Sequence, residues 1–248
     1  MGVVIKRRAI VAGGNPGMKV PVTGIQAGTL AVGSVVKLME GGAAVEYLVV
    51  NQGIPSNSSL YDASCDGTWL LRKDIHSNRQ WNYSNSNVYA NSAINTWLNS
   101  TFFNTLGSIE QAAVKQVNIP YCTGGGDTTI NSGANGLSVK VFLCGCYEVG
   151  WTTNDYDLFN VDGAKLEYFI PSTGSAADNK RTAKLNGREQ QWMTRTPVGD
   201  GNGAEFVVTS SGRYDTGLSK TSDGVRPALI LPKIALFDET TLILRGVA

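Results

Sequence analysis

Two stretches near the C-terminus decide how the chain folds: QWMTRTP at residues 191–197 and GVRPALILP at residues 224–232. Each stretch joins apolar residues to one arginine, Arg195 in the first and Arg226 in the second. Short apolar runs bounded by Gly and Pro are typical of buried strands, so strands are expected at 191–195 and 225–231. A buried guanidinium needs carboxylate or carbonyl partners. We therefore expect Arg195 and Arg226 to hold the structure together rather than to contact a ligand.

Upstream of these stretches, alternating apolar residues predict a hairpin over residues 34–51. Val36 and Leu38 fall on one strand face, Val45 and Tyr47 on another, and a Gly-Gly pair at 41–42 between them allows a tight turn. Further strands are expected over 69–71, 140–146, 204–209 and 236–244.

Two helices are expected between the strands. Residues 87–106 carry apolar side chains at three- and four-residue spacing, and Gly107 follows as a stop. An S-x-x-Q capping box that begins at Ser108 predicts a second helix to about residue 117. Helices between stretches of strand predict an α+β fold. The tryptophans expected in its core are Trp69, Trp97 and Trp192.

Composition bounds the class of protein. The chain has 248 residues, of which 42% are hydrophobic, enough for one large domain or two small ones. The formal net charge of +1 argues against a nucleic-acid partner. No apolar run approaches the length of a membrane span, and the start MGVVIKRR reverses the charge order of a secretory signal. We expect synthesis in a bacterial cytoplasm, no membrane insertion and free thiols.

Few residues suit catalysis. His76 is the only histidine, and we expect it to lie on the surface. A glycoside hydrolase needs two facing carboxylates, which Glu148, Asp155, Asp157, Asp162 or Glu167 could supply. We interpret these acids as solvated loop residues, with calcium binding by the Asp-Tyr-Asp run at 155–157 as an alternative.

No metal or other cofactor is expected. The chain contains no CxxC pair. Cys144 and Cys146 could hold a soft metal together with Cys65 or Cys122, but buried free cysteines are the simpler interpretation.

The loops are rich in aromatic and amide side chains. Tyr156 and Phe159 lie in a polar stretch over residues 152–163. Flat aromatic faces beside amides and hydroxyls suit the recognition of sugars and of protein surfaces. We therefore take Tyr156 and Phe159 as candidate ligand contacts.

The two C-terminal stretches resemble a W-x-R-[ST]-P … G-V-R-P-A-L signature of a domain common in gut Firmicutes and their prophages, although two residues, not one, lie between Trp192 and Arg195 here. Residues 61–71, 92–99, 141–143 and 148–150 fit the same family, and the resemblance covers about residues 33–233. It implies a C-type-lectin-like fold, similar to those of diversity-generating-retroelement variable proteins and formylglycine-generating enzymes. In such folds the two stretches form the core ladder. The loop between them, residues 198–223 here, carries binding, with Arg213 and Tyr214 as exposed contacts.

Two departures limit what the resemblance implies. No cysteine follows Cys146, so formylglycine-generating activity is not expected. The Glu-Pro-Asn, Gln-Pro-Asp and Trp-Asn-Asp triplets of calcium-dependent lectins are also missing from the sequence, so calcium-dependent sugar binding is not implied.

The sequence thus predicts a non-enzymatic phage virion protein. A β-rich N-terminal arm, residues 1–32, would attach it to other virion proteins, although this arm could equally be a strand pair of the main domain. Residues 33–248 would form the lectin-like domain, which would bind a host glycan or protein or decorate the shell, as a homo-oligomer in the particle. A cell-wall glycan or peptide hydrolase is the alternative. A bacterial surface adhesin is a third interpretation, which the missing secretory signal disfavours.

Overall fold

The computed structural model describes residues 23–151, 161–171, 173–199, 201 and 203–248. Nineteen strands in six sheets make up most of the regular structure in this part of the chain. The predicted α+β class, a lectin-like fold with two helices, is therefore wrong, and the fold is β-rich. The α-helices of the described part are short, namely Ala93–Trp97 (α1), Ser108–Ala113 (α2) and Ser175–Arg181 (α3).

The predicted helix over 87–106 is wrong in a specific way. It is divided into a 3-10 turn at Tyr89–Asn91, α1, a π-helical turn at Leu98–Phe102 and a second 3-10 turn at Phe103–Thr105. Hydroxyl and amide side chains bond to carbonyls of the preceding turn, as Thr96 does to Ser92 and Ser100 to Thr96. Such bonds compete with regular helical pairing. The apolar spacing therefore marks a buried face, but not a continuous helix.

The second predicted helix is shorter than expected. Gly107, not Ser108, occupies the position before its first turn, and the Gln111 amide donates to the carbonyl of Leu106 at 2.7 Å. The capping box does not form. The helix ends at Ala113, and a strand begins at Val117.

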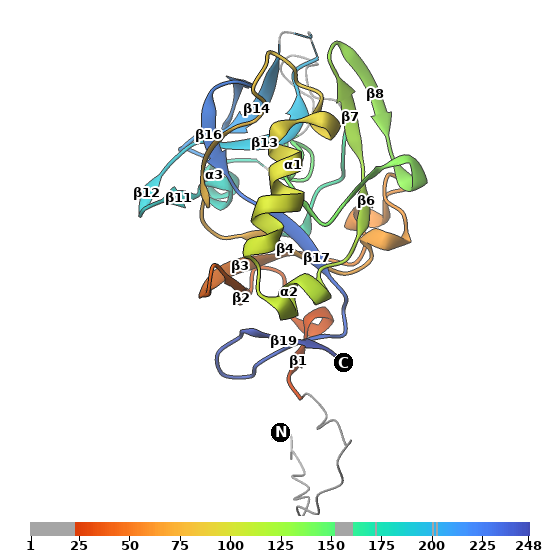
Figure 1. Ribbon diagram of the computed structural model, residues 1–248, viewed down its shortest axis with the longest axis vertical. Helices are drawn as coiled ribbons and strands as arrows, with labels where there is room; N and C mark the ends of the chain where they lie inside the picture. Colours follow the sequence, from red (N-terminus) through yellow and green to blue (C-terminus); the bar gives the residue numbers. More distant parts are fainter. Residues whose placement is uncertain (1–22, 152–160, 172, 200, 202) are drawn as a thin grey trace, which may run out of the picture.

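Two five-stranded sheets form the body of the molecule (Figure 1). The first has the order β10-β17-β4-β3-β2 and the second β15-β14-β13-β16-β5. The strands of the first are Val141–Phe142 (β10), Ala228–Leu231 (β17), Thr68–Arg72 (β4), Ala43–Gln52 (β3) and Val35–Glu40 (β2). Those of the second are Tyr214–Leu218 (β15), Ala204–Val208 (β14), Trp192–Pro197 (β13), Ser222–Val225 (β16) and Ser77–Gln80 (β5).

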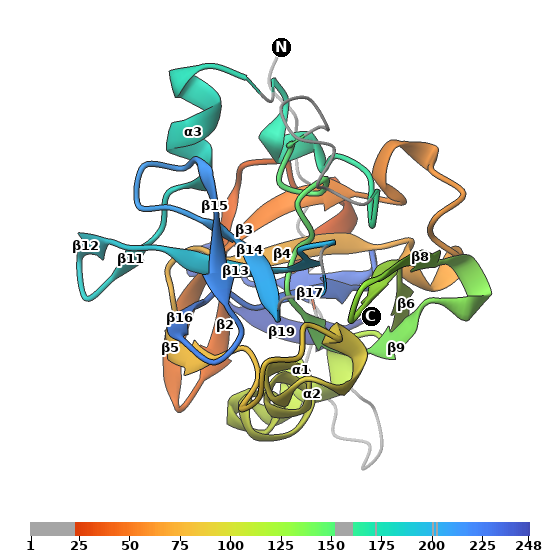
Figure 2. The same cartoon turned by 90° about the horizontal axis from the view of Figure 1, so that it is seen from above.

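Smaller sheets complete the fold. Ile25–Gln26 (β1), Ala235–Phe237 (β18) and Leu244–Val247 (β19) form a three-stranded sheet. The two-stranded sheets are Val117–Ile119 (β6) with Leu137–Val139 (β9), Tyr121–Gly124 (β7) with Asp127–Asn131 (β8), and Lys184–Leu185 (β11) with Arg188–Glu189 (β12). Seen from above, α1 and α2 lie on one side of the strands and α3 on the opposite side (Figure 2).

Several predicted strands are confirmed, and others need correction. The hairpin over 34–51 is β2 and β3, with Gly41 and Gly42 both at positive φ in the turn. The stretch 225–231 is not one strand, because β16 ends at Val225 in one sheet and β17 begins at Ala228 in the other. Arg226 and Pro227 make the crossing. The range 236–244 is likewise two strands, β18 and β19.

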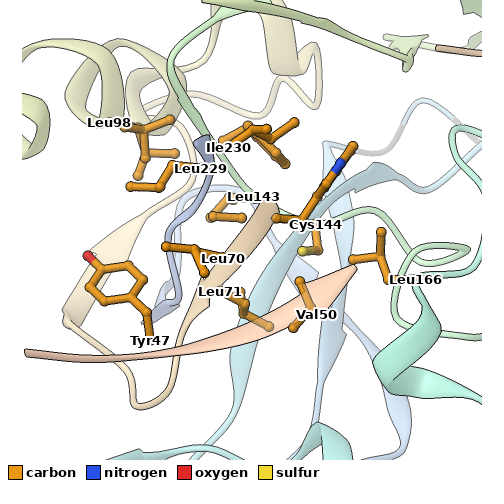
Figure 3. Close-up of a cluster of buried hydrophobic side chains, with 14 of the residues drawn as sticks. Tyr47, Val50, Leu70, Leu71, Leu98, Leu143, Cys144, Leu166, Leu229 and Ile230 are labelled. Carbon is orange, nitrogen blue, oxygen red and sulfur yellow. The ribbon is translucent and has the colours of Figure 1, made fainter. Parts of the chain in front are cut away.

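The core lies between the strands of the first large sheet and the segments that cover it (Figure 3). Leu70, Leu71, Leu229 and Ile230 come from its central strands and are fully buried. Burying side chains of this size contributes roughly 1.5–3 kcal/mol each. Of the predicted core tryptophans, Trp69 and Trp192 are completely buried, whereas Trp97 is only partly buried against the core.

The described end of the predicted N-terminal arm is part of the body. β1 pairs with β18, and the backbone N–H of Gly28 donates to the carbonyl of Lys233 at 2.9 Å. The Gln52 amide donates to the carbonyls of Ala27 and Leu30. Residues 23–32 thus dock on the domain, and the rest of the arm, residues 1–22, lies outside the described residues.

Candidate functional site

Arg195 is the centre of a buried ionic network. Its guanidinium pairs with both carboxylate oxygens of Glu148, at 2.6 and 2.7 Å, and donates to the carbonyls of Pro120, Leu143 and Asp162. These five bonds use all five of its N–H groups. Both Arg195 and Glu148 are completely buried. All of its donors are therefore used inside the fold, and the structural role expected for Arg195 is tested by a substitution described below.

This network removes two acids from the candidates for catalysis. Glu148 also accepts from Tyr61 Oη at 2.8 Å and from the N–H of Gly145 at 3.0 Å. Asp162 accepts from Thr196 Oγ1 at 2.8 Å, and burial raises the pKa of Asp162 to about 6. Neither side chain is accessible, so the interpretation of these two acids as solvated loop residues is wrong. Asp155 and Asp157 lie outside the described residues.

His76 is not the surface residue that the sequence predicts. It is half-buried, with its ring 5.3 Å from the rings of Trp97 and Phe102 and its Nε2 3.6 Å from Glu40 Oε1. Burial lowers the pKa of His76. Its Nδ1 lies 2.8 Å from the Ser77 hydroxyl. The Glu40 carboxylate is too far from Nε2 for a hydrogen bond and is bonded to Tyr47 and Arg72 instead, so it does not orient the imidazole.

The cysteines are free and buried, as expected. Burial raises the pKa of Cys65 to about 12 and the pKa of the Cys144 and Cys146 thiols further still. Thiolates are the form that binds metal, so these thiols are poor ligands. Among the described residues, no group of three or more His, Cys, Asp or Glu side chains could hold a metal ion.

A surface pocket forms between α3 and the turn that joins β14 to β15. We call it the Tyr214 pocket; it encloses about 630 Å3. Its lining residues are Trp151, Thr173, Gly174, Ser175, Asp178, Arg181, Arg213 and Tyr214. It combines aromatic rings, hydroxyls and charges of both signs, which suits an uncharged polar ligand with an apolar face.

The aromatic wall is a pair of rings. Those of Trp151 and Tyr214 meet edge to face, with centroids 5.8 Å apart. Trp151 is 7% exposed and Tyr214 37% exposed, so Tyr214 presents the accessible ring. Arg181 lies 5.3 Å from the Trp151 ring and donates through Nε to the carbonyl of Val149 at 2.7 Å. The buried Trp151 ring, packed against Arg181, thus supports the more exposed Tyr214 ring.

The charged wall joins the turn to α3. Arg213 is 78% exposed on its side chain and lies 3.8 Å from Asp178, which also pairs with Arg181 at 3.0 Å. Gly212 has φ +80°, and its backbone is in such close contact with the Asp178 carbonyl that a Cβ would overlap it. The turn is therefore fixed against α3, and glycine is the residue that permits it.

The structure brings together only part of the predicted site. Arg213 and Tyr214 line one pocket, whereas Tyr156 and Phe159 lie outside the described residues. Sequence reasoning missed Asp178 and Arg181 because α3 is too short, at seven residues, to show apolar periodicity. An aspartate followed three residues later by an arginine was the available signal.

Arg226, the second arginine of the signature, is buried beside Trp192, with its guanidinium carbon 5.0 Å from the ring centroid. It donates to two backbone carbonyls, those of Arg72 and Arg181. Its hydrogen-bond partners among the described residues are thus carbonyls alone, and the structural role expected for it stays a prediction.

Together, fold and site define a β-rich domain with an aromatic and charged surface pocket. The chain belongs to the family described as Domain of unknown function (DUF6273), whose sequence pattern matches residues 66–233 and includes both C-terminal stretches. No curated protein and no solved structure matches the chain. None of the described helices combines the length and apolar character needed to cross a bilayer.

Proposed function

We propose that the chain is a non-enzymatic binding protein whose Tyr214 pocket takes a glycan of a bacterial cell surface. The observation that carries the proposal is the accessible Tyr214 ring, supported by Trp151 and placed beside Arg213 and Asp178. A sugar has apolar C–H faces and a rim of hydroxyls. The ring would cover the first, and the charged pair and Ser175 would bond to the second.

The buried network favours binding over hydrolysis. Glycoside hydrolysis needs two accessible carboxylates on opposite sides of the scissile bond. Glu148 and Asp162 lie near each other, but both carboxylates are buried and both contact Arg195. Asp178 lines the pocket, but it is paired with two arginines, Arg181 and Arg213.

We further propose that the binding protein is part of a phage particle. The resemblance of the two C-terminal stretches to prophage domains supports this assignment. In this proposal residues 1–22 attach the chain to other virion proteins, since residues 23–32 already dock on the domain through β1. Several copies would then display the pocket on one particle, and their combined binding would exceed that of one copy.

The test of ligand binding uses Tyr214→Ala and Arg213→Ala. Each variant is expected to weaken binding to host cells or their isolated glycans about tenfold, because each removes an accessible contact. The melting temperature should change little. Tyr83→Ala is the matched control, because Tyr83 is 79% exposed and does not line this pocket. Equal binding by all three variants would refute the assignment of the pocket.

The particle assignment has its own experiment. The full chain and a chain lacking residues 1–22 are mixed with purified particles from which this protein is missing, and are then sedimented. Co-sedimentation of the full chain alone is expected. If neither chain sediments with particles, the virion assignment fails while the glycan-binding assignment stands or falls on the variants.

A further inference from the structure

The two signature arginines are both buried, but their surroundings differ. Arg195 has a carboxylate partner and uses all five N–H groups. Arg226 makes two hydrogen bonds, from Nε to the carbonyl of Arg72 at 2.8 Å and from Nη1 to the carbonyl of Arg181 at 3.5 Å. It forms no ion pair with any described residue.

A buried cation with open N–H groups is costly unless an anion approaches it. Burial lowers the pKa of Arg226 to about 10, so the guanidinium still carries its charge at neutral pH. The carbonyls of Arg72 and Arg181 satisfy two donors but carry no net charge to balance it. The Asp74 carboxylate acts on Arg226 from a distance but forms no ion pair with it, so the guanidinium has no direct negative partner among the described residues.

Arg226 also lines a second pocket, which we call the Arg226 pocket. It encloses about 300 Å3, at the small end of ligand pockets. Three lysines share its lining, Lys73, Lys180 and Lys184, against a single acid, Asp74. The potential inside this pocket is positive, and an anion entering it would meet donors from several directions.

The three lysines are not equally available. Lys73 pairs with Glu46 at 2.7 Å, and Lys180 donates to the carbonyl of Ile170 at 3.0 Å. Lys184 is exposed and makes no ion pair with a described residue. An ammonium carries three N–H donors, so Lys180 keeps donors for a ligand beside its carbonyl bond.

We propose that the Arg226 pocket binds a phosphate group, with the open N–H groups of Arg226 at its base and Lys180 and Lys184 at its rim. Donors from three side chains suit a tetrahedral oxyanion better than a planar carboxylate, which one arginine can satisfy alone. This site goes beyond the proposed glycan pocket. α3 separates the two, with Asp178 and Arg181 lining one pocket and Asn179 and Lys180 the other.

The experiment titrates the full-length protein with inorganic phosphate at constant ionic strength, with chloride as the balancing ion. The melting temperature is expected to rise and the shift to grow with phosphate, because a ligand that binds only the folded state stabilises it. In parallel, the Nε–H signal of Arg226 is followed by NMR. Glycerol phosphate and acetate replace inorganic phosphate in separate arms.

The variant is Lys180→Gln with Lys184→Gln, and the control is Lys220→Gln, an exposed lysine that does not line the pocket. The double variant is expected to bind phosphate at least about tenfold more weakly, since each lost charge-assisted bond contributes on the order of a tenfold effect. Without phosphate, the three proteins should melt within a few degrees of one another, because Lys184 and Lys220 are exposed and Lys180 makes a single carbonyl bond that the glutamine amide can replace.

Three results would overturn the proposal. Phosphate could stabilise the protein no more than chloride does, or the double variant could retain the affinity of the control. Acetate could also match phosphate, which would assign the pocket to carboxylates. Glycerol phosphate binding as tightly as inorganic phosphate would support a phosphate ester as the ligand. Weaker binding of the ester would support free phosphate.

Discussion

Replacing Glu148 by Gln tests how much of the stability depends on the buried network around Arg195. Glu148 accepts four hydrogen bonds, two from Arg195 and one each from Tyr61 and Gly145. The glutamine amide keeps one oxygen but turns an N–H2 group toward two donors. It therefore loses two bonds and leaves the guanidinium without its main counter-charge. Breaking one partner of a buried ion pair costs about 3–5 kcal/mol.

The measurement is urea denaturation at pH 7, followed by tryptophan fluorescence, with the free energy of unfolding extrapolated to water. The matched control is Glu46→Gln, because Glu46 pairs with Lys73 on the surface, where both side chains are nearly half exposed. An exposed pair contributes at most about 1 kcal/mol. If Glu148→Gln destabilises the protein no more than Glu46→Gln does, the network is not a support of the fold.

Three further changes test other parts of the structure. Trp192→Ala should cost about 3–5 kcal/mol in the same denaturation assay, since the ring is fully buried and its Nε1 donates to the Arg181 carbonyl at 2.9 Å; a near-silent change would contradict its burial. Burial raises the pKa of Glu205 from 4.5 to about 8, so the folded state holds a proton between these pH values that the unfolded chain releases. Stability from this group is fully present below pH 4.5, declines as pH rises from 4.5 to about 8 and is lost above that. Glu205→Gln should therefore flatten the dependence of the free energy of unfolding on pH in this range, and an unchanged slope would refute the shift. Gly212→Ala should lower the melting temperature and weaken ligand binding at Tyr214 together, because a Cβ would overlap the Asp178 carbonyl; normal binding would show that the turn can move.

The parts of the fold that could be predicted are those in which the spacing of apolar residues along the chain is enough to define the strands. In the hairpin of β2 and β3, apolar and polar residues alternate on both sides of a glycine turn, and this pattern fits only two paired strands. The crossing at Arg226 and Pro227 could not be predicted in this way. The run from Val225 to Leu231 is apolar except for Arg226, and the spacing of its apolar residues does not indicate that it serves two sheets.

The prediction of one helix over residues 87–106 was wrong for a related reason. Its apolar spacing is real, and Ile94, Leu98 and Phe102 are buried. Periodicity reports which face is covered, however, and not which hydrogen bonds the backbone makes. The Ser, Thr and Asn residues between the apolar positions bond to nearby carbonyls and interrupt the α-helical pairing.

For the site residues, the residue type indicated whether a side chain would be buried, but the sequence did not indicate which residues would contact it. An arginine in an apolar strand is expected to be buried with a partner, and Arg195 is buried and paired with an acid. Which acid would meet it depends on loops far apart in the sequence, and Glu148 is 47 residues away. The same limit explains why Asp178 was not connected with Arg213, since their contact exists only because Gly212 lets the turn approach α3.

The small sheet of β1, β18 and β19 lies at one end of the molecule (Figure 1). The chain enters the body through β1 and leaves it through β19 at the lower end in Figure 1, whereas α3 and the second large sheet lie toward the upper end. A support joined to the chain before Ile25 would hold the domain at its lower end, with α3, β13, β14 and β16 away from the support. In the proposed particle, the same three short strands would therefore set both the point of attachment and the end of the domain that points away from it.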